Sequence, residues 1–371
     1  MLLAKLENTV ELLAHVLLLI VLLTVVACNE SVDTGAGPTE SDVLVTMVDH
    51  AAQPSLDQVA QTAGQLEVKV RQLADKPTAQ TLAEAQSAWR DAYLSWLKAS
   101  PFRFGPSEHL ERQIGRWPVN GIVLDAAVTS AELKHLLSNP ELRGYAAVEH
   151  LLFAPTDITA VTAKGRLSHL LDITQEIVRL TAKAKSQWDD DYAMQFKSAG
   201  DGKPFLIPAD ALSLVVRKSL NITETTLRDR IGMPSGFFEA PVKPDTLEAW
   251  QSGHTKASLK AINQGLRQVL VMDGDDASLR RLIATQDGLV ETKNPTLAAD
   301  IAKQLDRIDK TIEGLGGDDL KLEVELASHP TKLKRLYKQF QTLQDQLVEA
   351  ALVLELDVHR ASDMTVLTQK P

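Results

Sequence analysis

A carboxylate and an imidazole stand next to each other in the apolar segment 143–153, which reads RGYAAVEHLLF. Glu149 and His150 are residue types that bind metal ions, and a carboxylate placed among apolar neighbours needs a metal, a cation or a proton as its partner. At Ala146 a methyl group stands where a metal-binding residue would form a site with Glu149. His150 follows Ala146 by four residues and so lies on the same helical face. We therefore take Glu149 and His150 as candidate metal ligands, with an ion pair between Glu149 and Arg103 as the structural alternative.

The surrounding residues indicate how this pair is positioned. Asn139 can act as an N-cap, Pro140 suits the first helical position, and Pro155 ends a helix. The sequence therefore predicts one short, mostly apolar helix that carries Glu149.

Three further side chains are candidates for ligand binding. Arg103, in FRFGP, can hold an anion through its fork of donors, although such an arginine also ties a loop to a buried carboxylate. Tyr145 lies on the same four-residue stripe as Glu149. His254, in SGHTKASL, lies at a predicted helix start, where it either faces the Glu149 region or serves as a solvated capping residue.

Apolar residues recur at spacings of three and four through most of the chain, beginning with the run from Leu56 to Leu73. SLDQ at Ser55 and TLAE at Thr81 have the form of capping boxes. Further helices are predicted at 167–184, 209–231, 255–272, 279–290, 295–315 and 331–357. No strong run of alternating apolar and polar residues competes with them.

The pattern predicts an all-α protein made of two helical bundles, at 43–200 and 205–371. The acidic, glycine-containing stretch 189–204 is the predicted boundary. A second irregular stretch, 232–253, is too long for a simple turn, and loops of this length are often functional or pack across an interface.

The amino terminus indicates export. Residues 12–27, LLAHVLLLIVLLTVVA, are apolar except for His15, and this run is shorter than the roughly 20 residues of a membrane-spanning helix. It ends in VVAC, which resembles a bacterial lipobox. We predict a lipoprotein signal peptide at 1–27, lipidation of Cys28 and a flexible tether at 28–42. A single N-terminal transmembrane anchor is the alternative.

Composition narrows the class of partner. The chain has 371 residues and a formal net charge of -10, so the phosphate backbone of a nucleic acid is repelled on average and no nucleic acid partner is expected. Cys28 is the single cysteine, which excludes an intrachain disulfide.

Several motifs, taken in order, resemble the imelysin-like family of exported bacterial proteins. They are AWRDAYLSWLKASPFRFGP, RWPVN, GYAAVEHLLF, LRDRIGMP, SGHTKASLKAINQGLRQVL and LVLELDVHRASDM. The resemblance implies two helical bundles and a periplasmic or outer-membrane lipoprotein linked to iron uptake. The family pattern Gly-x-His-x-x-Glu is matched by Gly144 and Glu149, but Ala146 occupies the histidine position.

Three functional interpretations follow. The first is an outer-membrane lipoprotein that faces the periplasm and binds iron or another metal ion in support of its uptake. The second is a metallopeptidase, after the peptidase assignment of the family, but a zinc peptidase needs two or three His or Glu ligands and a general base, and no His-Glu-x-x-His occurs. The third is an interaction module that has lost the ancestral site, as Ala146 suggests, and binds a partner protein in the envelope.

Overall fold

The computed structural model describes residues 37–129, 137–155, 157–202, 204–238, 241–286, 294–316 and 321–358. The described residues from Pro38 to Val358 belong to one compact unit. Every regular element within the described ranges is a helix, which confirms the all-α prediction. The predicted signal peptide, Cys28 and the tether up to residue 36 lie outside the described residues. None of the described helices is both long and apolar enough to cross a membrane.

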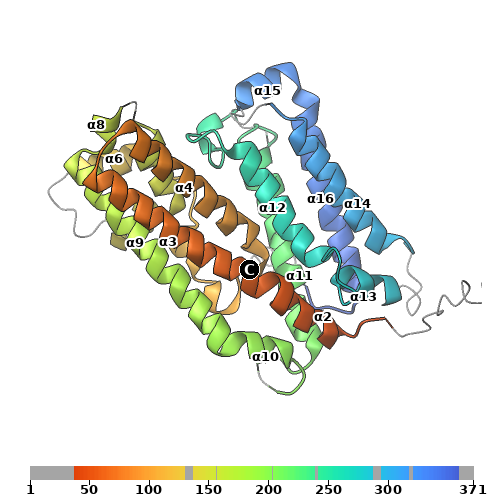
Figure 1. Ribbon diagram of the computed structural model, residues 1–371. Helices are drawn as coiled ribbons and strands as arrows, with labels where there is room; N and C mark the ends of the chain where they lie inside the picture. The colour runs from red at the N-terminus through yellow and green to blue at the C-terminus, as the bar shows by residue number, and fades with distance from the viewer. Residues whose placement is uncertain are drawn as a thin grey trace, which may run out of the picture. The chain divides into compact units, whose positions relative to one another are not determined.

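The first half of this unit is built on three long helices, which lie side by side in Figure 1. They are α3 (Gln53–Asp75), α4 (Ala79–Lys98) and α9 (Lys164–Gln187). Shorter elements connect and cover them: α2 (Glu40–Met47), η1 (Val48–Ala52), η2 (Ser100–Phe102), η3 (Gly105–Ser107), α5 (Leu110–Ile114), α6 (Gly121–Thr129), η5 (Pro140–Leu142), α7 (Tyr145–Phe153) and α8 (Ile158–Val161).

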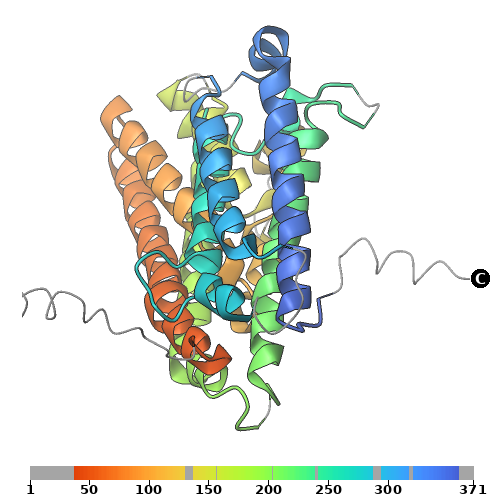
Figure 2. The ribbon, with the colours of Figure 1, turned by 90° about the vertical axis from the view of Figure 1, so that its right-hand side faces the viewer.

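The second half is built on four helices, of which α14 and α16 run side by side in Figure 2. They are α11 (Pro208–Thr225), α12 (Thr255–Leu270), α14 (Leu297–Glu313) and α16 (Pro330–Val353). The smaller elements of this half are η7 (Thr226–Gly232), η8 (Pro244–Thr246), α13 (Leu279–Gln286) and α15 (Leu322–Ser328). The remaining two, η6 (Trp188–Tyr192) and α10 (Ala193–Lys197), continue α9 and belong to the first half, where α10 packs on α2.

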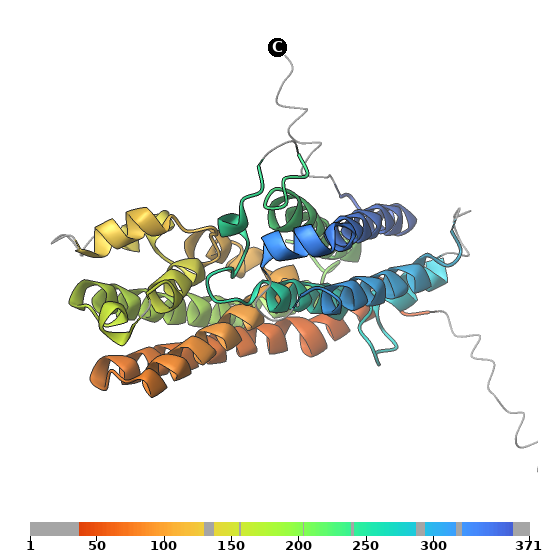
Figure 3. The ribbon, with the colours of Figure 1, turned by 90° about the horizontal axis from the view of Figure 1, so that it is seen from above.

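The two halves pack directly on each other. Figure 3 shows α12 between α4 and α14, and α12 contacts both of these helices. In addition, α2 from the start of the unit packs on α11. The predicted boundary between two bundles, with the first ending at residue 200 and the second beginning at residue 205, stays a prediction.

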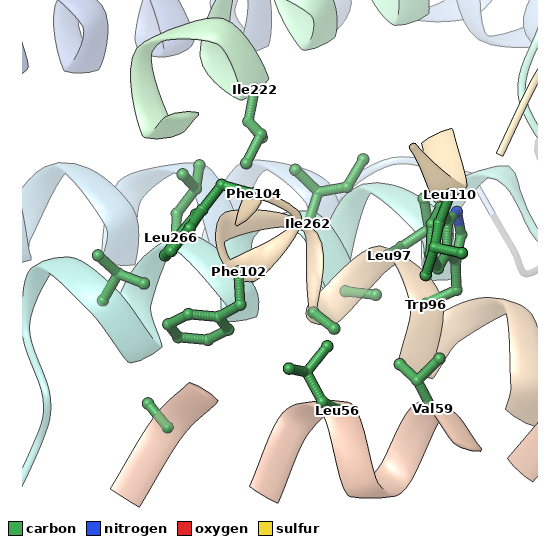
Figure 4. Close-up of a cluster of buried hydrophobic side chains, with 14 of the residues drawn as sticks. Leu56, Val59, Trp96, Leu97, Phe102, Phe104, Leu110, Ile222, Ile262 and Leu266 are labelled. Atoms are coloured by element: carbon green, nitrogen blue, oxygen red, sulfur yellow. The ribbon is translucent and has the colours of Figure 1, made fainter. Parts of the chain in front are cut away.

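An apolar cluster holds this junction together (Figure 4). Leu56 and Val59 of α3 lie on one side, and Ile222 of α11 extends towards Ile262 of α12 on the other. These four side chains are buried, as is Phe102 between them. Burying apolar surface contributes about 25 cal/mol per Å², so the cluster ties the N-terminal helices to the C-terminal ones.

Several predicted helix starts were wrong. Ser55 lies inside a helix, because the π-helical turn η1 continues directly into α3. The N-cap of α4 is Thr78, whose hydroxyl accepts a hydrogen bond from the N–H of Thr81, so the capping box begins three residues earlier than predicted. The stretch 189–204 begins with helix rather than loop, because Trp188 and Phe196 bury their rings in the core. Likewise α2 begins at Glu40, inside the predicted tether.

Candidate functional site

The helix that carries Glu149 starts later than predicted. Asn139 and Pro140 begin only the short 3-10 turn η5, and α7 starts after Gly144, its N-cap residue, whose φ is +86°. A Cβ at Gly144 would lie 2.5 Å from the carbonyl oxygen of Ile114, so only glycine allows this approach. This close contact sets where α7 begins.

A hydrogen bond from a side chain of α4 also fixes the start of α7. The indole Nε1 of Trp89 donates a hydrogen bond to the carbonyl oxygen of Tyr145, at 2.9 Å. Residues 145–152 are all buried, Glu149 included, so the apolar sequence of α7 reflects its position inside the fold.

The Glu149 carboxylate is bound by backbone rather than by a cation. Its Oε1 accepts a hydrogen bond from the N–H of Ser252, at 2.9 Å, and only 7% of the residue is exposed. Burial raises the pKa of Glu149 to about 7, and the nearby Glu248 adds to the rise, while the Ser252 N–H opposes it. At neutral pH the carboxyl group therefore exists in both protonation states.

Ala146 and Glu149 line the same small cavity, of about 40 Å³, which we call the Glu149 cavity. Asp245 and Gln251 also line it and offer oxygen atoms. The remaining lining residues are Trp117, Pro118, Val119, Leu247 and Trp250. A space of this size holds one or two waters or a single ion. The lining contains no histidine.

His150 makes contacts elsewhere. Its Nε2 lies 3.0 Å from Asp125 Oδ1, and its Nδ1 lies 3.0 Å from the side-chain amide of Gln251. The same Asp125 pairs with Arg166, which also donates to the carbonyl oxygen of His150, at 3.1 Å. The His150 imidazole ring packs directly against α6, since a Cβ at Gly121 would lie only 2.4 Å from it. His150 thus links α6, α9 and the segment 232–253, and it does not line the Glu149 cavity.

Arg103 pairs with Glu111 and not with Glu149. Its Nη2 lies 3.5 Å from Glu111 Oε1, and its guanidinium carbon lies 4.1 Å from the centre of the Trp96 ring. The suggested ion pair between Arg103 and Glu149 was therefore wrong.

Tyr145 and His254 are packed among aromatic rings. The Tyr145 ring centre lies 5.6 Å from that of Tyr93, and burial raises the pKa of the Tyr145 phenol. His254 precedes α12, and its ring packs edge-on against Trp89, at 6.1 Å. Neither residue lines the Glu149 cavity.

A buried charge network beside the Glu149 cavity was missed from the sequence. Glu248 accepts hydrogen bonds from the phenol of Tyr93, at 2.8 Å, and from Arg230 Nε, at 2.5 Å. Arg230 also lies over the ring of Trp117, with 4.9 Å between its guanidinium carbon and the ring centre. Tyr93 and Glu248 are 155 positions apart, so no local spacing could have indicated their contact.

The donor set around Glu149 is incomplete for a zinc peptidase. Within the described ranges, no three His, Cys, Asp or Glu side chains are grouped so that they could share one metal ion. Ala146 stands where the Gly-x-His-x-x-Glu pattern has its histidine, and catalytic zinc sites use three protein ligands.

The fold and these motifs define a helical protein of the imelysin type. The Imelysin family model, which carries a peptidase designation, matches residues 52–349, so the chain belongs to this family. Iron-regulated protein A from Synechococcus elongatus is 28% identical over 217 residues, which is 57% of this chain and 59% of that relative.

Two solved structures share the fold. An iron-regulated protein A precursor from Parabacteroides distasonis matches with a TM-score of 0.74 at 20% identity, over 86% of this chain and 97% of the other. An imelysin-like protein from Psychrobacter arcticum matches with a TM-score of 0.66 at 14% identity, over 86% of this chain and 96% of the other.

Proposed function

We propose that this imelysin family member is a binding protein of the cell envelope that supports iron acquisition. The observation that carries the proposal is the buried Glu149 carboxyl group, which lines a cavity of ionic size together with Asp245 and Gln251. The Synechococcus relative, whose name describes it as iron-regulated, supports iron as the metal.

The chemistry of the Glu149 cavity suits reversible binding. Carboxylate and amide oxygens are hard donors, and a metal ion must displace the proton from Glu149 before that carboxylate can bind it. Because the pKa of Glu149 is raised to about 7, affinity is expected to fall as the pH drops below neutrality. Two carboxylates and one amide give a weak site suited to transfer rather than to storage.

The location in the envelope forms part of the same proposal. Cleavage before Cys28 and its acylation would anchor the chain through lipid, and Asn29 in place of aspartate favours the outer membrane, with the folded unit facing the periplasm.

Peptide hydrolysis is the weaker candidate, because the residues that line the Glu149 cavity include no histidine and no third carboxylate. An interaction module that binds an envelope protein is the stronger second candidate. The hydrogen bond from Ser252 favours it, since a backbone donor already holds the Glu149 carboxylate.

Calorimetric titration of the full chain in detergent with Fe²⁺, without oxygen, separates these functions. We expect binding at pH 7.5 that weakens about twentyfold at pH 5.5, as the fraction of ionised Glu149 falls. Glu149→Gln should abolish binding, whereas the exposed control Glu141→Gln should not. Ala146→His should tighten it by restoring the histidine of the family pattern.

Absence of heat with the wild-type protein and with Ala146→His would remove metal capture and leave the interaction module. Chelator-sensitive cleavage of unfolded peptides by the wild-type chain, lost in Glu149→Gln, would instead support the peptidase.

A further inference from the structure

A second and much larger cavity lies where the two halves of the unit meet. Its volume is about 710 Å³, it opens to solvent, and it is lined by residues of η2 and α5 and by residues of α11 and η7. We call it the Arg103 cavity. It shares no lining residue with the Glu149 cavity. Cavities of 300–1,000 Å³ are typical of small-molecule sites, so this one has room for a metabolite.

The inner wall of the Arg103 cavity carries buried positive charge. The side chains of Arg103, Arg230 and Lys218 are 4%, 10% and 18% exposed. Glu111 faces two of these cations at once, with Lys218 Nζ at 2.6 Å and Arg103 Nη2 at 3.5 Å. Burial opposes ionisation of Glu111, but Arg103 and then Lys218 lower its pKa to about 2. Arg230 pairs with Glu248, which does not line the cavity, so the three cations have two carboxylate partners, of which only Glu111 belongs to the lining.

The outer edge of the cavity has the opposite balance. Glu224, Arg228 and Asp229 line it there, and Arg228 Nε pairs with Asp229 at 2.9 Å. The side chains of Arg228 and Asp229 are 59% and 28% exposed, which places them nearer to solvent than the inner cations. Glu224 acts electrostatically on the same Arg228, so these three residues carry one acidic charge in excess.

The inner cations are the donors that a ligand in the cavity could meet. Among the described residues, neither Arg103 Nε nor Ser100 Oγ has a hydrogen bond, but both atoms are closed off from the cavity as well as from solvent. The case for an anionic group therefore rests on Arg103 and Lys218, whose charged side chains belong to the lining and suit a carboxylate.

Two apolar side chains also belong to the lining. Ile222 and Ile262 approach each other from α11 and α12, as Figure 4 shows, and both line the Arg103 cavity. They offer contact to a short carbon skeleton held between the charged ends.

We propose that the Arg103 cavity binds a small zwitterion of the amino-acid or dipeptide class. Its carboxylate pairs with the charged side chains of Arg103 and Lys218, and its ammonium group lies towards Glu224. The site differs from the Glu149 cavity in residues and in ligand charge, so the proposal does not depend on iron binding.

The test uses the full chain in detergent and metal-free buffer. Thermal shift is measured with the twenty amino acids and the dipeptide Ala-Ala, followed by calorimetric titration of the ligands that raise the melting temperature. At least one of these probes should bind, and its analogue without the amino group should bind more weakly, because Glu224 then lacks its cation. If no probe binds, or if the amino-free analogue binds equally well, the proposal is overturned.

A matched pair of variants locates the site. Lys218→Gln should weaken binding by roughly tenfold or more, whereas Lys260→Gln, which also removes a lysine paired with one glutamate, should not. Equal binding by the two lysine variants would refute the location.

Discussion

The raised pKa of Glu149 makes the stability of this protein depend on pH in a direction that can be measured. In the folded state this pKa is about 7, against 4.5 for the ordinary side chain, so folding favours the protonated form. The associated stability is fully present below pH 4.5 and is lost as the pH rises through 7. A shift of this size corresponds to about 3 kcal/mol, most of it lost between pH 4.5 and pH 7.

Glu149→Gln replaces the titrating group by a neutral one of the same shape that can still accept the hydrogen bond from Ser252. Other carboxylates titrate equally in both proteins, so the difference between the variant and the wild type isolates Glu149. We expect the stability of the variant relative to wild type to increase by about 2.5 kcal/mol between pH 5 and pH 8. Urea denaturation in metal-free buffer at both pH values measures it.

The exposed control Glu141→Gln should show no such change, since that side chain is 55% exposed and pairs with Arg116 at the surface. A stability difference for Glu149→Gln that stays constant from pH 5 to pH 8 would refute the reasoning. It would mean that the pKa of Glu149 in the folded protein stays close to 4.5, so that the carboxylate is largely ionised at both pH values.

Two further predictions concern the elements that position the site. Gly144→Ala should destabilise the protein by about 1–3 kcal/mol in urea denaturation, because its φ is +86° and its Cβ would approach the Ile114 carbonyl oxygen to 2.5 Å. Gly64→Ala in α3, where a Cβ meets nothing within 4 Å, should stabilise by about 0.5–1 kcal/mol, and equal effects of the two would contradict this account. Glu248→Gln should lower stability by about 3–5 kcal/mol, since it leaves Arg230 buried without its charge partner; a loss below about 1 kcal/mol would show that Arg230 finds another partner.

Helix positions were well predicted wherever the helical spacing of apolar residues continued over many residues. The prediction of 255–272 corresponds to α12 (Thr255–Leu270), and that of 331–357 to α16 (Pro330–Val353). Helix starts were less well predicted, because a capping pattern such as SLDQ at Ser55 also fits the interior of a helix that begins upstream. The helix break at Gly144, just before α7, depends on contact with Ile114, thirty positions away, so the local sequence could not predict it.

The candidate site was predicted only in part, for a similar reason. Glu149 was found because a carboxylate in an apolar helix is unusual, and its burial is confirmed. Its partner Ser252 and the neighbouring Glu248 lie in the irregular segment 232–253. The length of this segment indicated a functional or interface loop, but its residues follow no helical or strand periodicity that would predict their contacts.

The sequence by itself determined the helical class, the motifs that resemble the family and the alanine at position 146, because apolar periodicity and residue identity are local properties. Only the tertiary structure decided which charges meet. It turned His150 towards Asp125, paired Arg103 with Glu111, and joined Tyr93 to Glu248. Burial raises the free energy of an unpaired charge, so each partner is chosen by the packing of distant helices and not by neighbours along the chain.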